Sequence, residues 1–196
     1  MNSTTLEAVK EKALSMVSAR RRAHVLGCAV AAKALAERYG YAPELAYLSG
    51  LLHDITKEFD RDGQLKLCKQ YGIIPSPVEE REWKLLHAKT GAAVAADVFG
   101  APADVVQAIR YHTTGRSGMT LPEKILYLAD YIEETRNFPG VEHVREVAFF
   151  DIDRALLRGF ELTIREILDR GGLISVDTVD AYNDLQMAPL HLPNAD

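Results

Sequence analysis

The chain has 196 residues, 47% of them hydrophobic and 26% charged, with a formal net charge of −5. This length suits one well-buried domain, and the negative balance excludes a broad basic surface for nucleic acid. No run approaches the roughly 18 apolar residues of a membrane span, and the Met1 end does not resemble a signal peptide. Cys28 and Cys68 match no metal or redox spacing, so we expect reduced thiols and a cytoplasmic protein.

Helical periodicity recurs along the chain, and no alternating strand pattern of useful length is present. Pro75-Ser76-Pro77 is expected to break the chain, whereas Thr120 and Glu123 have capping-box spacing ahead of an apolar helix. Helices are predicted, in chain order, over 4–19, 21–39 (closed by Gly40), 43–54, 60–72, 83–99, 102–112, 120–132, 141–149, 151–170 and 175–185.

These elements predict an all-α fold in which one domain is packed around one core. We expect an N-terminal helix in 1–18, the domain itself in 19–186, and a flexible, proline-containing tail in 187–196.

The pair His53-Asp54 ends an apolar helix, and Lys57 follows three residues later. A buried charge is costly unless it is paired or bound to a metal, so this is an unusual way to build a core. A lone pair of this kind is more often a helix end that reaches solvent. The other histidines and acids of the chain therefore decide between the two interpretations.

Further imidazoles and carboxylates interrupt apolar faces on separate helices. Taken singly, His24 fits a hydrogen-bonded core residue, His87 a helix cap, and His112 a helix end favoured by the dipole. Asp130 lies within the apolar run 125–132 and needs a partner there. Convergence on a metal explains all of them together. Mixed imidazole and carboxylate ligands suit iron, manganese, zinc or cobalt better than calcium.

Several longer motifs occur in a fixed order. They are Leu52-His53-Asp54-x-x-Lys57, Leu86-His87-Ala88, the run 108–120 that contains Tyr111-His112-Thr113-Thr114-Gly115-Arg116, Glu123-Lys124, Ala129-Asp130-Tyr131-Ile132-Glu133, Arg136-x-Phe138-Pro139-Gly140-Val141, Asp177-Thr178 and Ala181-Tyr182-Asn183. On these residues, across about 21–183, the chain resembles the HD-domain metal-dependent phosphohydrolases, and most closely their symmetrical bis(5′-nucleosyl)-tetraphosphatases. One departure is Lys89, which stands where the family has proline; it leaves the start of this helix open and allows a cation near the phosphates.

The resemblance implies an HD-type helical bundle that cleaves diadenosine tetraphosphate and related dinucleoside polyphosphates symmetrically to two ADP. It implies iron, as one or two ions, with manganese, cobalt or zinc as alternatives. The implied metal ligands are His24, His53, Asp54 and Asp130. His87 and His112 either hold a second metal or contact phosphate, and the sequence leaves this choice open.

A substrate with about four negative charges needs cations around the bond that breaks. Arg can bind phosphate through two hydrogen bonds and Lys acts as a point charge, while 173–178 can form a wall against a nucleobase. The catalytic candidates are Asp54, Lys57, His87 and His112. The candidates for substrate binding are Arg21, His24, Lys57, His87, His112, Arg116, Arg136, Ile174, Asp177 and Thr178.

Two other functions stay open at this point. One is a different HD-type nucleotide phosphohydrolase, acting on deoxynucleotides or cyclic nucleotides. The other is a nucleotide-binding or ribosome-associated module without turnover, although the presence of all six candidate ligands argues against it. The expected partners are the dinucleotide and its ADP product, with no DNA-binding surface, no membrane and room for a homodimer.

Overall fold

The computed structural model describes residues 3–187, and every regular element in that range is a helix. The all-α prediction is therefore confirmed. In these residues eleven α-helices and one 3₁₀ turn follow one another: α1 (Ser3–Ser15), α2 (Ala19–Tyr39), α3 (Pro43–Leu52), α4 (Arg61–Tyr71), α5 (Pro77–Arg81), η1 (Trp83–Leu85), α6 (Leu86–Phe99), α7 (Ala103–Tyr111), α8 (Leu121–Ile132), α9 (Val141–Ala148), α10 (Ile152–Asp169) and α11 (Val176–Met187).

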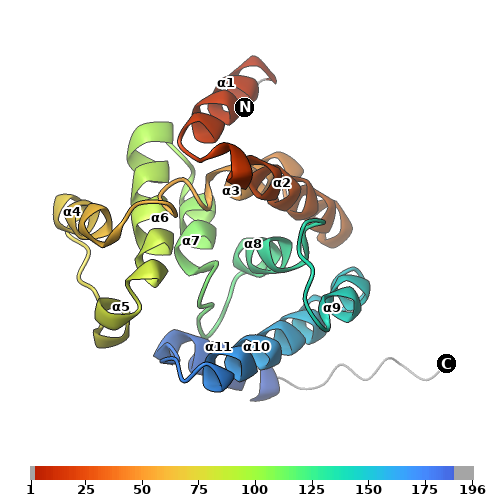
Figure 1. The fold of residues 1–196 in the computed structure, drawn as a ribbon. Coiled ribbons are helices and arrows are strands. Elements are labelled where there is room, and N and C mark those ends of the chain that lie inside the picture. Colours follow the sequence, from red (N-terminus) through yellow and green to blue (C-terminus); the bar gives the residue numbers. More distant parts are fainter. Residues whose placement is uncertain (1–2, 188–196) are drawn as a thin grey trace.

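Helix α8 is the central element of the fold (Figure 1). It packs against α2 and α3, against α7, and against α9 and α10. Ile125, Leu126 and Leu128 of α8 are fully buried although they point in different directions around the helix axis. A helix that is apolar around its whole circumference is stable only when other helices surround it. The apolar run that the sequence shows thus becomes the centre of the molecule.

The helix boundaries agree with most of the predicted ones, because the residues at the ends behave as expected. Gly40 closes α2 in the left-handed conformation, with φ of 73°. At the start of α8 the Glu123 carboxylate accepts the backbone N–H of Thr120 at 2.7 Å, one arm of the predicted capping box. Helix α6 begins at Leu86, one residue before His87.

Pro75-Ser76-Pro77 breaks the chain between α4 and α5 as predicted, but it also begins a helix that was not predicted. A short helix, α5, starts at Pro77 because Ser76 and Glu79 form a second capping box. The Ser76 backbone N–H donates to Glu79 at 2.8 Å, and the Glu79 N–H donates to the Ser76 hydroxyl at 3.3 Å. Proline suits the first helical position because its missing N–H would be unpaired there anyway.

The loop 113–118 joins α7 to α8 and is held against α10. Gly115 has φ of 64°, and a Cβ there would lie 2.5 Å from Cζ of the fully buried Phe160. Only glycine fits this approach. The loop is thereby fixed between the ends of several helices.

The division into 1–18, 19–186 and the tail 187–196 stays a prediction. Met187 ends α11, and the rest of that tail lies outside the described residues. No helix in the described range is both long and apolar enough to cross a bilayer.

Candidate metal centre

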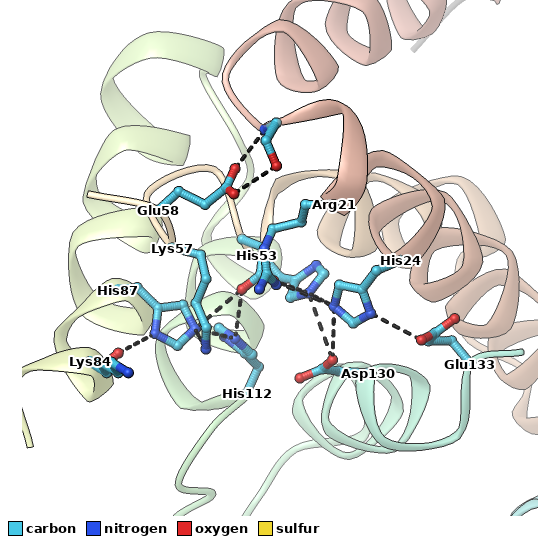
Figure 2. A network of polar contacts seen from close by, with 12 residues as sticks. Arg21, His24, His53, Lys57, Glu58, Lys84, His87, His112, Asp130 and Glu133 are labelled. Carbon is cyan, nitrogen blue, oxygen red and sulfur yellow. Dashed lines mark hydrogen bonds and ion pairs between the residues drawn. The ribbon is translucent and has the colours of Figure 1, made fainter. Parts of the chain in front are cut away.

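Six side chains from five helical segments converge beside the N-terminal half of α2 (Figure 2). They come from α2, from the turn that follows α3, from the first turn of α6, from the residue after α7, and from the last turn of α8. In that order they are His24, His53 with Asp54, His87, His112 and Asp130. Apart from Asp54, which is next to His53, these residues lie 29 to 77 positions away from it in the chain. The packing of the helices is therefore what brings them together.

The first half of the cluster contains the two anionic side chains. His24 Nε2 lies 3.2 Å from His53 Nε2, 3.4 Å from Asp54 Oδ2 and 3.2 Å from Asp130 Oδ1. His53 Nε2 lies 3.4 Å from the same Asp54 oxygen and 3.9 Å from Asp130. Asp130 was expected to be buried, but its side chain is 19% exposed because it also faces the adjoining pocket.

The second half of the cluster uses the other oxygen of Asp54. His87 Nε2 lies 3.3 Å from Asp54 Oδ1, and His112 Nε2 lies 3.9 Å from it. The two imidazoles face each other, with 3.0 Å between their Nε2 atoms. Lys57 Nζ lies 3.1 Å from His87 Nε2. Asp54 therefore stands between both halves.

These residues fit a divalent metal. Ligand atoms at about 2.1 Å from an ion lie about 3.0–3.4 Å from one another, and the first half of the cluster has nearly this spacing. Two sets of three donors have all their ligand atoms within 4.8 Å of one another: His24, His53 and Asp130, and His53, Asp54 and His112. The donors are imidazole nitrogens and carboxylate oxygens, which suit iron, manganese, zinc or cobalt.

Electrostatics divides the four histidines into two pairs. Burial alone lowers the pKa of His24, but hydrogen bonds with Asp130 and Asp54 raise it to about 9. Burial also lowers the pKa of His53, but neighbouring groups that include Asp54 outweigh burial and raise this pKa well above its usual value. The positive charges of these two imidazolium groups balance the negative charges of Asp54 and Asp130. A divalent ion can supply the same positive charge, and its binding releases the protons of His24 and His53.

The second pair of histidines is neutral. Burial lowers the pKa of His87, and burial together with the neighbouring imidazoles lowers that of His112 further. Burial also lowers the pKa of the Lys57 ammonium. A neutral imidazole offers its Nε2 lone pair to a metal, and once protonated it can donate to a phosphate oxygen, so both interpretations of His87 and His112 stay open.

Two of the predicted arginines reach the cluster. The Arg21 guanidinium is paired with Asp54 Oδ2. Arg136 is paired with Asp130 Oδ1 and donates from Nε to the Asp130 carbonyl at 2.8 Å. Both side chains are partly exposed, so each presents donors to a ligand as well as to a carboxylate.

Two other cations do not reach the cluster. Arg116 binds the buried Glu123 through two contacts, of 3.1 and 3.0 Å, and lies over the Tyr111 ring in a separate hollow. Lys89 is bound to Glu79 at 2.7 Å. The structure therefore does not bring Arg116 to the metal centre, and Lys89 supplies no cation there.

A pocket of about 750 Å³ opens from the cluster toward α10 and the start of α11. Lys57, His112 and Asp130 form its inner end, and Thr178 lies on its far wall. Ile174 and Asp177 are neighbours of the wall-forming Leu173, Ser175 and Thr178 but are not part of it themselves.

Some residues of this region had no predicted role. Tyr131 and Phe138 line the pocket with their rings edge to face, 5.0 Å between centroids, and both belong to motifs noted above. Leu162 and its neighbours on α10 also line it, but an amphipathic helix gives no sign in sequence that its inner face borders a cavity.

Comparison with known proteins agrees with this geometry. The HD domain family model matches residues 21–135. A protein of Bacillus subtilis named symmetrical bis(5′-nucleosyl)-tetraphosphatase is 35% identical over 89% of this chain and 96% of its own length. One of the same name from Halalkalibacterium halodurans is 38% identical, over 89% and 95%. The crystal structure of a predicted HD superfamily hydrolase involved in NAD metabolism, from Clostridium acetobutylicum, superposes with a TM-score of 0.88 at 36% identity and covers 92% of this chain and 96% of that one.

The fold and the site define a metal-dependent phosphohydrolase of the HD class. Within that class, the chain belongs to the family of proteins named symmetrical bis(5′-nucleosyl)-tetraphosphatase.

Proposed function

We propose that this protein hydrolyses diadenosine tetraphosphate and related dinucleoside polyphosphates symmetrically, giving two ADP. The observation that carries the proposal is that the His/Asp cluster opens directly into a pocket large enough for a nucleoside diphosphate half. Relatives that match nearly end to end bear the name of this activity. They favour it over a deoxynucleotide or cyclic-nucleotide hydrolase and over a module that only binds.

His24, His53, Asp54 and Asp130 are the proposed ligands of the metal, for which we propose iron. The ion supplies polarisation of a phosphoryl oxygen and a lower pKa for a coordinated water molecule. The two carboxylates give this set the negative charge that attracts a divalent cation, while the imidazoles complete it.

The remaining polar residues act on the phosphates. Lys57, next to His87, provides positive charge beside the ligand set. Arg21 and Arg136 lie at its two carboxylates and can turn their exposed donors to phosphate oxygens. His87 and His112 are neutral, so either can take a proton from the attacking water at Nε2 and then pass it to a leaving oxygen.

The pocket beyond the cluster determines which bond is cut. We propose that a base and ribose lie among Tyr131, Phe138 and Thr178, beside Ile174 and Asp177. One nucleoside with two phosphates then fills the distance to the ligand set. Water attacks the second phosphate, the bond between the second and third phosphates breaks, and ADP leaves.

The test is an early time point of diadenosine tetraphosphate hydrolysis in ¹⁸O-labelled water, with the metal-replete protein. We expect ADP as the only nucleotide product, with one ¹⁸O on the β-phosphate of one of the two molecules. Equal amounts of ATP and AMP would contradict the proposed position of the base.

The same assay separates the alternatives. Faster release of product from deoxynucleoside triphosphates or cyclic nucleotides would identify a different phosphohydrolase. Tight binding of ADP without turnover, at full metal occupancy, would identify a binding module. Metal analysis of protein purified without oxygen tests iron against manganese, cobalt and zinc.

A further inference from the structure

The four imidazoles of the cluster all point Nε2 inward, so each Nδ1 must be held from behind. Three of them donate from Nδ1 to a backbone carbonyl one helical turn earlier in the chain: His53 to Gly50 at 2.7 Å, His87 to Lys84 at 2.6 Å and His112 to Ile109 at 2.7 Å. His24 is different. Its Nδ1 lies 3.0 Å from the Glu133 side chain, so a residue that can be replaced fixes this ring (Figure 2).

Glu133 is well placed for this task. It follows α8 directly, one turn after Asp130, so one segment carries both a proposed metal ligand and the partner of another ligand. Its side chain is 0% exposed. The Thr135 backbone N–H donates to it at 2.8 Å, and the Thr135 hydroxyl donates as well. The Glu133 oxygens thus meet N–H and O–H donors from Thr135 and a ring nitrogen of His24, the surroundings that a carboxylate requires.

Helix α2 leaves room for this carboxylate at one position. Gly27 lies one turn after His24, and a Cβ there would stand 2.6 Å from Glu133 Oε2. Such a distance is far below van der Waals contact, and the neighbouring atom is the fixed end of a buried side chain. Glycine at this position therefore serves the approach of Glu133 to His24.

We propose that Glu133 is a positioning residue of the metal site. By accepting the Nδ1–H of His24 it fixes the ring, so that Nε2 faces Asp54 and Asp130 and offers its lone pair to a metal once its proton is released. A carboxylate behind an imidazole also makes that imidazole a stronger donor to a metal. This inference rests on the ligand set of the proposed function, and nothing in it depends on the substrate.

The test is the affinity of the purified apoprotein for Co²⁺ alone, measured by competition with a chromophoric chelator, together with the visible spectrum of the bound ion. We expect Glu133→Ala to bind Co²⁺ about 10–100-fold more weakly, with altered bands. Glu133→Gln keeps the shape and a hydrogen-bond acceptor but not the charge. Its Co²⁺ affinity should therefore lie between that of the wild type and that of Glu133→Ala.

Glu123→Gln is the matched control. Glu123 lies in the first turn of α8, the helix that Glu133 follows. As whole residues both are 1% exposed, and Glu123 touches none of the proposed ligands. Its loss should lower the melting temperature and leave the Co²⁺ affinity unchanged. If Glu123→Gln weakens Co²⁺ binding as much as Glu133→Gln does, the effect is a general destabilisation of α8, and the proposal is overturned. Wild-type affinity and spectrum in Glu133→Ala would overturn it too.

Gly27→Ala is a second test of the role of Glu133, because it alters the position of the carboxylate without altering the residue itself. The added methyl should displace Glu133 and weaken Co²⁺ binding, but only while Glu133 is present. In Glu133→Ala the clash is gone, so the double variant should bind no worse than the single one. Additive losses would overturn the proposal. If Glu133→Ala does not fold, wild-type affinity in Glu133→Gln has the same meaning.

These outcomes are separate from those of the proposed function. A wild type that binds Co²⁺ but does not cleave the dinucleotide contradicts the function and leaves the role of Glu133 intact. If the wild type cleaves the dinucleotide and Glu133→Ala binds Co²⁺ normally, the proposed function is supported and the role of Glu133 is contradicted.

Discussion

Asp54 is the residue that the two halves of the cluster share. One of its oxygens faces His24 and His53, and the other faces His87 and His112. Its pKa is well below the usual range, because the imidazoles that hydrogen-bond to it outweigh its burial. It is therefore an anion at neutral pH, and no neutral side chain can supply its charge.

We expect Asp54→Ala to lose bound metal and nearly all turnover. The fall in metal affinity should exceed the roughly 10–100-fold that is typical for a residue behind a ligand. Metal content after dialysis and hydrolysis of diadenosine tetraphosphate are the measurements, and a helical circular dichroism spectrum is the control for folding. A variant that retains both metal and activity would remove Asp54 from the ligand set.

The arginines differ in a way that the sequence did not show. Arg136 lies at the cluster, whereas Arg116 is bound to Glu123. We expect Arg136→Ala to lower kcat/KM by roughly 10–150-fold, corresponding to the loss of one charge-assisted hydrogen bond of about 1.5–3 kcal/mol. Arg116→Ala should lower kcat/KM less and the melting temperature more, because it leaves a buried carboxylate unpaired. The opposite ranking would show that Arg116 leaves Glu123 and turns to the substrate.

At the scale of elements, α5 shows how a five-residue helix is held in place. Its capping box connects Ser76 and Glu79, and Glu79 is also bound by Lys89 from α6. Burial raises the pKa of Glu79, but the bonds from Lys89 and Ser76 outweigh it and lower the pKa below the ordinary 4.5. The carboxylate thus stabilises the junction of two helices in its charged form.

We expect Glu79→Gln to reduce stability at neutral pH by about 1–3 kcal/mol. Since the pKa of Glu79 is lower in the folded than in the unfolded protein, its contribution is complete above 4.5 and is lost as the pH falls through the folded-state value. Melting temperatures of the wild type and the variant should therefore converge in acid. A difference that stays constant with pH would mean that the charge is not involved.

At the scale of the whole molecule, the pocket exists only because distant segments meet. Its inner end comes from α7, α8 and the turn after α3, and its wall from α10 and the segment before α11. Phe138, between α8 and α9, stands with Tyr131 at the pocket. This arrangement places an aromatic surface in the same pocket as Lys57, His112 and Asp130.

We expect Phe138→Ala to weaken ADP binding by about 1–3 kcal/mol, the usual contribution of a base stacked on an aromatic side chain. Binding of inorganic pyrophosphate should not change, because it lacks the base. Phe150→Ala is the matched control, since Phe150 is 80% exposed and does not line the pocket. Equal losses for ADP and pyrophosphate would mean that Phe138 only shapes the phosphate end.

The sequence by itself predicted most of the helices, with α5 as an exception, and the residues of the cluster. Apolar periodicity and helix-end residues such as Gly40 and Thr120 act over one or two turns, so they can be recognised in the chain. His53-Asp54 and Asp130 stood out because a charged group in an apolar run needs a partner. The HD-type bundle and its family followed from the motifs around these residues.

Only the tertiary structure decided which partners those residues have. It placed Arg136 at Asp130 and Arg116 at Glu123, although both lie in loops close to predicted ligands. It put Glu133 behind His24, 109 positions away. The pairing of Glu133 with His24 depends on how α2 and α8 cross, and a crossing is set by the packing of whole helix faces, which no local pattern in the sequence records.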